Sequence, residues 1–519
     1  MKHLNSFSKE ELIQIIQNNE KDIQKITSER NIYLQELLLL RYRQFAQKSE
    51  KLPKEEQLQA WLFNETETHS KEKDTDEERL NIIKVSSHKR RKRGRKPLPS
   101  NLPAEEIIHD LSEEEKICSC CNNQLKKIGE DKSEELEYIP AQLKIIRHIR
   151  YKYSCSCDEN TSGVITPPAP VKLIPKSFST PSLLAHVMVS KFCDALPFYR
   201  QEKIFKRFGI DLPRSTMCNW AVKIHEKTDS LLELMEEELK NENLLLIDET
   251  TVQVLKEPGK SAQSQSYMWA FVGGNKDSPV ILYKYRERRT THFLNEFLDN
   301  FRGVMLTDGY EAYDKIGQLK GITHAGCWAH VRRKFFEHYE IDPTDSEKPF
   351  LKIIQTLYGI EKEIRESFLS SDEILRKRQK ESGPIVKDFF NRIIEKSKTI
   401  PPKSSLGKAI HYALNQKHKL LVFLENPQTP IDNNFAENII RPFVVGRKNW
   451  LFSDTMKGAH ASAAIYSIIQ TAILNGLEPY WYLRYLFEKL PFAAHLEDLE
   501  KLLPNKVKQD ELKKYFGLP

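Results

Sequence analysis

The sequence predicts a multidomain α/β protein. Its 519 residues are enough for roughly three or four domains. Between residues 241 and 340, short apolar runs come first, and strand and helix patterns then alternate, which is typical of an α/β sheet. Helical patterns dominate on both sides of this region. The composition, 39% hydrophobic and 29% charged, is that of a soluble protein with real cores.

Composition also limits the compartment and the partners. No apolar run approaches the ~18 residues of a membrane span, and the N-terminus lacks the apolar core of a signal peptide. We therefore expect a cytoplasmic protein without a membrane partner. Five of the eight cysteines lie between Cys118 and Cys157, a density that indicates metal binding in that compartment. The net charge of +7 equals the seven basic residues of the run 89–96, so the basicity is local.

The N-terminal segment, residues 1–50, predicts a coiled-coil helix. Residues 8–47 contain no Gly or Pro, and alternating steps of four and three residues mark a heptad seam. We expect self-association through this seam, and a helix packed on its own protein is the alternative. The seam consists of Leu12, Ile16, Asn19, Ile23, Ile26, Arg30, Tyr33, Leu37 and Leu40.

Residues 51–105 predict a polar linker that ends in a basic run and several prolines. The basic run could lie in a DNA minor groove, where narrow A·T tracts attract arginine. The alternative is a solvated tether with non-specific affinity for phosphate. Both interpretations predict nucleic acid as a partner and involve Arg90, Arg91, Arg93 and Arg95.

Residues 106–175 predict a small zinc-binding β module. Cys118-x-x-Cys121 and Cys155-x-Cys157 bracket a segment with strand-like alternation. Two short cysteine pairs can supply four thiolates to a tetrahedral Zn²⁺, a closed and therefore structural site. Cys120 and Asp158 are further possible ligands.

Residues 176–240 predict helices. Thr180 and Pro181 suit an N-cap and a first helical position. Further helices are expected at 200–208 and, with a Ser-Thr cap, at 215–225, which together outline a helix-turn-helix. Either this segment contacts DNA, or it is a helical spacer. The candidate contacts are Arg214, Asn219 and Lys223.

The predicted catalytic core begins at residue 241, and its first part ends at 340. Strands are expected at 244–247, 267–273, 280–285, 303–310 and 322–328, with a helix at 293–301. Two of these strands are expected to end in Asp248 and Asp308. Such α/β sheets place their sites at strand ends.

A charged helical insertion is expected at 341–425, the core then resumes over 426–475, and 476–519 form a C-terminal helical cap. The resumed core contains Glu437. By itself this stretch predicts a capped helix with its N-cap among residues 432–434, buried Ile439 and Ile440, and a kink or end at Pro442.

Asp248, Asp308 and Glu437 form a candidate metal site. Phosphoryl transfer to or from DNA commonly uses two divalent cations, and Mg²⁺ (or Mn²⁺) prefers carboxylate oxygens. Each residue alone could be an ordinary turn or helix residue. The cations that follow Glu437 could grip DNA, whereas Trp450 is undecided between core packing and base stacking. These cations are Arg441, Arg447 and Lys448.

His324, Cys327 and His330 have ligand types suited to Zn²⁺, but no fourth ligand is apparent. We interpret them as structural. His330, Arg332 and Arg333, which share one predicted helix, are candidates for phosphate contact.

The chain resembles the transposases of the insertion sequence 66 family. The resemblance covers nearly the whole chain and is carried by LLLIDETTVQV, MLTDGYEAY, GCWAHVRRKF and DNNFAENIIRPFVVGRKNWLFS, which occur in this order. It implies an RNase H-like fold with a helical insertion and catalytic Asp248, Asp308 and Glu437. It also implies metal-dependent hydrolysis at transposon ends, followed by attack of the freed 3′-hydroxyl on target DNA.

The heptad seam predicts a homo-oligomer, and accessory proteins encoded by the same element are candidate partners. The one-residue gap in Cys155-x-Cys157, where two residues are common, departs from the family pattern. Two other interpretations keep the same fold: a DNA-binding protein without catalysis, and a nuclease without strand transfer. No GxxxxGK[ST] motif supports an ATP-driven mechanism.

Overall fold

The computed structural model describes residues 143–152, 166–274, 278–341 and 348–518, together with scattered helical positions between 9 and 33. The chain divides into two compact units, one of residues 1–68 and 171–515 and the other of residues 69–170 and 516–519. The predicted zinc ligands and the basic run lie outside the described residues: Cys118, Cys121, Cys155, Cys157, Arg90, Arg91, Arg93 and Arg95.

The described positions between 9 and 33 are helical, as the heptad pattern predicts. Several apolar seam residues are exposed there, namely Ile16, Ile23, Ile26 and Tyr33. In the second unit, residues 143–152 form no strand, although the alternation of the sequence predicts one. Arg150 donates a hydrogen bond from this segment to the carbonyl of Pro167 (3.1 Å).

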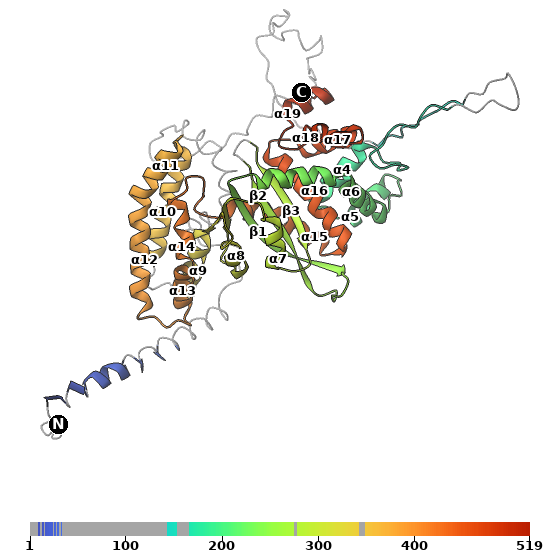
Figure 1. Ribbon diagram of the computed structural model, residues 1–519. Helices are drawn as coiled ribbons and strands as arrows, with labels where there is room; N and C mark the ends of the chain where they lie inside the picture. The colour runs from blue at the N-terminus through green and yellow to red at the C-terminus, as the bar shows by residue number, and fades with distance from the viewer. Residues whose placement is uncertain are drawn as a thin grey trace, which may run out of the picture. The chain divides into compact units, whose positions relative to one another are not determined.

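A mixed sheet forms the centre of the first unit (Figure 1). The strand order is β3-β2-β1-β4-β5, and β6 pairs separately with β1. The β1–β2 and β2–β3 pairs are antiparallel, whereas the β1–β4, β4–β5 and β1–β6 pairs are parallel. The strands are β1 (Leu244–Lys256), β2 (Gln265–Gly273), β3 (Val280–Arg286), β4 (Gly303–Thr307), β5 (Ile322–Gly326) and β6 (Ser453–Thr455).

The position of Asp248 corrects one expectation. We expected the first strand to end there, but β1 continues to Lys256 because its β-branched second half pairs with β2, with Val252 opposite Ser266. The parallel pairing of β1 with β4 stops at Leu246 opposite Leu306. Asp248 therefore lies two residues beyond that pairing, level with Asp308, which follows the last residue of β4 as predicted.

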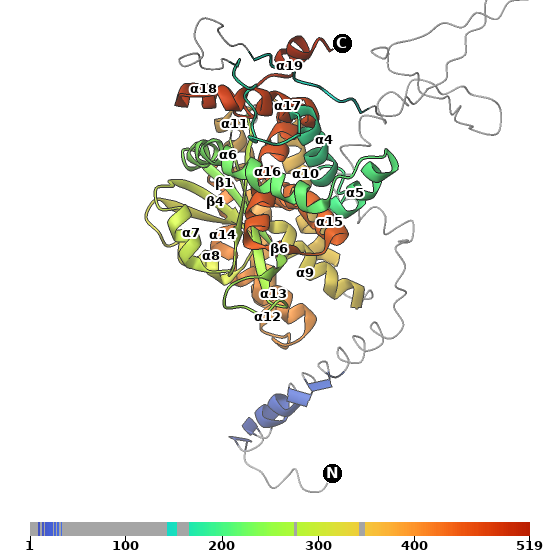
Figure 2. The same cartoon turned by 90° about the vertical axis from the view of Figure 1, so that its right-hand side faces the viewer.

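One helix covers the outer edge of the sheet. Helix α16 (Met456–Leu474) runs along β3, and α6 packs on α16 (Figures 1 and 2). Buried hydroxyls of Ser467 and Thr471 accept hydrogen bonds from the β3 amides of Tyr283 (2.7 Å) and Ile281 (3.0 Å). These bonds satisfy strand amides that would otherwise template pairing with another chain.

The helices before the sheet are α4 (Pro181–Phe192), α5 (Phe198–Arg207) and α6 (Arg214–Lys240). Thr180 caps α4 by accepting from the amide of Leu183 (3.2 Å), as predicted. The predicted Ser-Thr cap of α6 is wrong, because Pro213 occupies the N-cap position without a side-chain bond. Helix α6 is also far longer than predicted, because its buried face continues along α16 and β3. Its candidate DNA contacts, Arg214, Asn219 and Lys223, are exposed.

The region between β5 and α15 is helical and has its own core, in which α9, α10, α12 and α13 pack together (Figure 1). Trp328 is fully buried there, and its indole nitrogen donates to the carbonyl of Leu420 (3.0 Å). The elements are α9 (Trp328–Ile341), α10 (Lys348–Glu366), α11 (Ser371–Lys377), the π-helix η3 (Arg378–Ser382), α12 (Gly383–Ser397), α13 (Ser405–Asn415), α14 (Lys417–Leu420) and η4 (Val422–Leu424).

The remaining elements are α7 (Thr291–Phe297), α8 (Glu311–Ile316), α15 (Asn434–Trp450), α17 (Pro479–Lys489), η5 (Leu490–Phe492), α18 (Leu496–Glu500) and α19 (Gln509–Phe516). Pro442 lies inside α15 instead of ending it. Within the predicted C-terminal helical cap, turns separate α18 from α19. None of the described helices is long and apolar enough to span a membrane.

Acid should destabilise the sheet through His324. This β5 residue is buried, its Nε2 lies 2.8 Å from the Thr307 hydroxyl at the end of β4, and burial lowers its pKa to about 3. Below pH ~6.5 the unfolded chain binds a proton that the folded chain excludes, so stability falls as pH falls towards 3. We expect this histidine to account for about 2–3 kcal/mol of lost unfolding free energy between pH 7 and 4.5.

The measurement is chemical denaturation of the protein and of a His324→Gln variant across this pH range. The glutamine can still bond Thr307 but does not titrate, so the stability of the variant should fall less steeply in acid. Equal acid slopes for both proteins would contradict this account of His324.

Candidate active site

The start of α15 is held to the sheet by one buried asparagine. Asn433 occupies the N-cap position and is 1% exposed. Its side-chain Nδ2 donates to the carbonyl of Ile247 in β1 (2.9 Å), and its backbone amide donates to Cys327 Sγ (3.2 Å). The amide of Trp328 also donates to the carbonyl of Ile431 (3.1 Å). The entry to α15 is therefore fixed against β1 and against the turn between β5 and α9.

Glu437 lies one helical turn after this anchor, and its amide donates to the carbonyl of Asn433 (3.1 Å). Asp248 is the residue that follows Ile247. Its pKa is raised well above its ordinary value, first by burial and then by the negative charges of Glu437 and Asp308. The three carboxylates that the sequence singles out therefore lie near enough for their charges to interact.

Basic side chains contact the carboxylates. Arg333 NH2 lies 3.4 Å from Glu437 Oε2, and His330 Nδ1 lies 3.7 Å from Glu437 Oε1. Arg289 pairs with Glu249 and lies 4.0 Å from Asp308 Oδ2. The guanidinium of Arg289 also lies over the ring of Tyr310, 3.3 Å from its centre.

The charges of this group do not balance. Asp248, Glu249, Asp308 and Glu437 carry −4 when all are ionised, and Arg289 and Arg333 carry +2, which leaves −2. Glu437 Oε1 and His330 Nδ1 are also buried atoms without a hydrogen-bond partner among the described residues. A divalent cation with oxygen ligands would offset this charge and give the orphaned carboxylate oxygen a partner. The residues present therefore fit Mg²⁺ or Mn²⁺.

The loop after β4 is shaped to present Asp308. The amide of Tyr310 donates to Asp308 Oδ1 (3.0 Å), so the carboxylate is held close to its own backbone. Gly309 lies against the helical insertion, since a Cβ there would lie 2.6 Å from the hydroxyl of Tyr412 in α13. The insertion therefore contacts the site directly and limits the movement of the Asp308 loop.

The His-x-x-Cys-x-x-His motif does not converge as a unit. His324 bonds Thr307, whereas ligand atoms of Cys327, His330 and Glu437 lie within 4.8 Å of one another. Burial lowers the pKa of His330 and raises the pKa of the Cys327 thiol. His324 thus serves the sheet, while His330 belongs to the surroundings of Glu437.

The candidate DNA contacts on this unit differ in exposure. The side chain of Arg333 is 43% exposed at the site, and Arg441 and Lys448 are exposed on α15. Arg447 directs its NH1 to the backbone of Thr251 and to nearby threonine hydroxyls. The expectation that Arg332 contacts phosphate is wrong. This residue is 4% exposed and lies near Tyr358 of the helical insertion, so it is not available to DNA on the surface.

Trp450, which the sequence left undecided, is half-buried and packs against protein side chains. Its ring lies edge-on to Phe443 with 5.5 Å between the ring centres, and Lys191 lies over its face. Base stacking by this side chain would require it to leave those contacts.

Sequence reasoning missed Glu249 and Arg289, and it predicted an N-cap among residues 432–434, which is Asn433, without its contact to β1. The carboxylate of Glu249 also accepts a hydrogen bond from the hydroxyl of Tyr313. The position of Glu249 directly after Asp248, a predicted site residue, was a usable signal in the sequence. Arg289 and Asn433 act only through contacts with distant strands. For them the sequence offers the basic run after β3 and the paired asparagines before Glu437, neither of which is specific.

The fold and this site define an α/β protein with a helical insertion and an acidic cluster at the junction of β1, β4 and α15. Residues 176–461 match the family described as Transposase IS66 family, and the chain belongs to it. Its other parts match in order: residues 33–107 match "Transposase C of IS166 homeodomain", 115–158 match the zinc-finger binding domain of transposase IS66, and 467–505 match the IS66 C-terminal element.

Two relatives from Sinorhizobium fredii (strain NBRC 101917 / NGR234) extend over most of the chain. Uncharacterized protein y4qI is 30% identical over 508 residues, which cover 95% of this chain and 92% of the relative. Uncharacterized protein y4jD is 31% identical over 427 residues, which cover 80% of this chain and 82% of the relative.

Replacing Asn433, which holds the start of α15 to β1, should destabilise the protein. Asn433→Ala removes a buried donor and leaves the carbonyl of Ile247 without it, so we expect the free energy of unfolding to fall by about 1–3 kcal/mol. Asn434→Ala is the matched control, because the Asn434 side chain bonds only to the neighbouring Asp432. Urea denaturation measures both, and an Asn433→Ala variant no less stable than the control would contradict the anchoring role.

Proposed function

We propose that this chain is the DNA transposase of an insertion sequence. It binds the ends of its element, hydrolyses the phosphodiester there and joins the freed 3′-hydroxyl to target DNA. The observation that supports the proposal is the electrostatic interaction of Asp248 with Asp308 and Glu437 in a member of the transposase IS66 family. We also infer an RNase H-like core, which is supported by the order β3-β2-β1-β4-β5 with three antiparallel strands followed by two parallel ones.

The catalytic role is assigned to the three carboxylates. Asp248, Asp308 and Glu437 would hold Mg²⁺ (or Mn²⁺), which supplies activation of the attacking oxygen and stabilisation of the leaving oxygen. Their positions on a strand, a strand-end loop and an anchored helix keep the oxygens oriented before DNA arrives. Burial first, and then the charges of Glu437 and Asp308, raise the pKa of Asp248, and a bound cation would offset that unfavourable charge.

The flanking arginines suit the substrate's charge. Arg289 lies beside Asp308 and Arg333 beside Glu437, so both would meet a DNA phosphate bound at the carboxylates. Each is now paired with a carboxylate, and each guanidinium has further donors for phosphate oxygens. They would orient the scissile phosphate and partly neutralise its charge.

DNA binding outside the site is assigned to several parts of the chain. The basic run with Arg90, Arg91, Arg93 and Arg95 would contact the backbone or minor groove, and Arg441, Arg447 and Lys448 would contact DNA beside the site. The match to a zinc-finger binding domain supports a structural Zn²⁺, which we assign to Cys118, Cys121, Cys155 and Cys157.

We further propose that the protein acts as a homo-oligomer, with accessory proteins of the same element as additional partners. The exposed seam of the N-terminal helix supports the first of these, because apolar side chains at heptad spacing suit a second helix.

Glu437→Gln should abolish both end cleavage and strand joining. The amide keeps the shape of the side chain but loses the charge that holds a cation, so we expect a loss of at least about 100-fold in rate. The assay incubates purified protein and Mg²⁺ with labelled element ends and a target plasmid. Glu425→Gln, at an exposed position away from the site, is the control.

Three results are distinguishable in this assay. Joined product from wild type and control, with bound but uncut ends for Glu437→Gln, supports the transposase. Nicked ends without joined product would make the protein a nuclease, and binding without nicking would make it a DNA-binding protein. Joining by Glu437→Gln at the wild-type rate would overturn the metal assignment.

A further inference from the structure

One edge of β1 is left without a strand partner beside the active site. Pairing with β4 ends at Leu246, and pairing with β6 begins only at Val254. Between Leu246 and Val254, no described strand pairs with this edge of β1. Side chains from α15 fill part of the gap. Asn433 bonds the carbonyl of Ile247, and Arg447 bonds the carbonyl of Thr251. The gap therefore lies along the same helix that carries Glu437.

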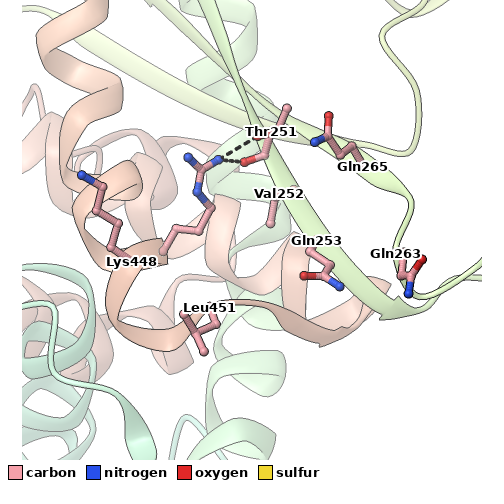
Figure 3. A pocket seen from close by; sticks show the side chains of 8 residues that line it. Thr251, Val252, Gln253, Gln263, Gln265, Lys448 and Leu451 are labelled. Atoms are coloured by element: carbon pink, nitrogen blue, oxygen red, sulfur yellow. Dashed lines mark hydrogen bonds between the residues drawn. The ribbon is translucent and has the colours of Figure 1, made fainter. Parts of the chain in front are cut away.

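A pocket of about 400 Å³ opens at the far end of this gap. Gln253, Gln263 and Gln265 line it from the β1–β2 hairpin, while Lys448 and Leu451 line it from the end of α15 (Figure 3). Its size is that of a small-molecule site, large enough for one nucleobase and too small for a duplex. No carboxylate lines the pocket, so nothing in it repels a nucleic acid.

Leu451 is held over the pocket in a strained conformation. Its φ of 68° and ψ of −53° place it at the centre of a γ-turn, closed by a hydrogen bond from the amide of Phe452 to the carbonyl of Trp450 (2.9 Å). Such a conformation is unfavourable for a side chain with a Cβ, and its side chain is 63% exposed. An exposed apolar side chain kept in this geometry provides a surface on which a planar base can stack.

The glutamines supply hydrogen bonds of the kind that base edges need. Gln253 donates its Nε2 to the carbonyl of Ala262 (2.7 Å), which orients its Oε1 as an acceptor. Gln263 and Gln265 are exposed at the pocket, and each amide offers one acceptor and two donors. A glutamine amide matches the N6 and N7 atoms of adenine, donating to N7 and accepting from N6. Thymine and guanine present a carbonyl oxygen at the corresponding position.

We propose that this pocket binds one unstacked adenine of the DNA strand next to the scissile phosphate and so contributes to the choice of element end. The inference rests on the proposed function. Thr251 in the pocket follows Asp248 by three residues, or about 10 Å along a strand, which corresponds to about three nucleotides of stacked DNA. Leu451 stacks on the base, the glutamines contact its edge, and Lys448 at the rim meets a neighbouring phosphate.

The test measures base preference without catalysis. Fluorescein-labelled hexamers of deoxyadenosine and of thymidine are titrated with the full-length protein, in about 0.2 M salt without divalent cations, and followed by anisotropy. We expect the wild type to bind the adenine hexamer at least about fivefold more tightly. A Gln263→Ala, Gln265→Ala double variant should reduce this ratio below about twofold. Gln318→Ala, at an exposed turn after α8, should leave the ratio unchanged.

A second variant separates stacking from folding. Leu451→Gly removes the stacking surface and suits the positive φ, so it should weaken binding of the adenine hexamer while leaving Tm unchanged or higher. The proposal is overturned if the wild type shows no base preference. It is also overturned if the glutamine double variant and Leu451→Gly both retain the full adenine preference. End cleavage with Mg²⁺, measured on the same preparations, reports separately on the proposed function. Inactive protein with a clear adenine preference would contradict that function and leave the pocket's role standing.

Discussion

The geometry of the candidate active site depends on the hydrogen bond from Asn433 to the carbonyl of Ile247. The helical insertion separates Asp308 from Glu437 in the sequence, so chain connectivity alone cannot bring the two carboxylates together. The anchor solves this problem locally, because it ties the first residue before α15 to the residue that precedes Asp248. A second bond, to Cys327, ties the same asparagine to the turn that begins the insertion. The helical insertion therefore begins and ends next to the same buried residue, Asn433.

The anchor has an electrostatic consequence. It holds Glu437 near Asp248, whose pKa is raised first by burial and then by the charges of Glu437 and Asp308, an arrangement that would be unfavourable without a cation. Burial of a charge without a partner costs several kcal/mol, so such a cluster persists only where the surrounding fold holds it. The fully packed core around Trp328 and the hydroxyls of α16 on the edge of β3 supply that rigidity. The carboxylates that would hold a cation for catalysis thus lower the stability of the fold when no cation is bound.

Much of this fold could be predicted from local patterns. Apolar runs identified the five longer strands, and an N-cap threonine identified the start of α4, because both signals act over a few residues. Three errors have tertiary causes. Asp248 lies inside β1 because β2 pairs with the continuing strand, Arg332 is buried by the insertion, and α6 is long because α16 covers it. The carboxylates were identified by residue type, whereas Asn433 and Arg289 act only through strands distant in sequence.

The central claim is that a divalent cation binds where β1, β4 and α15 meet. Iron-mediated cleavage of the polypeptide tests it directly, because Fe²⁺ bound at a Mg²⁺ site generates radicals that cut the backbone only nearby. With Fe²⁺, ascorbate and peroxide, the account predicts cuts near Asp248, Asp308 and Glu437, all suppressed by excess Mg²⁺ and absent from a variant that lacks Glu437. Cuts confined to other regions, or cuts at these three positions that Mg²⁺ does not suppress, would contradict it.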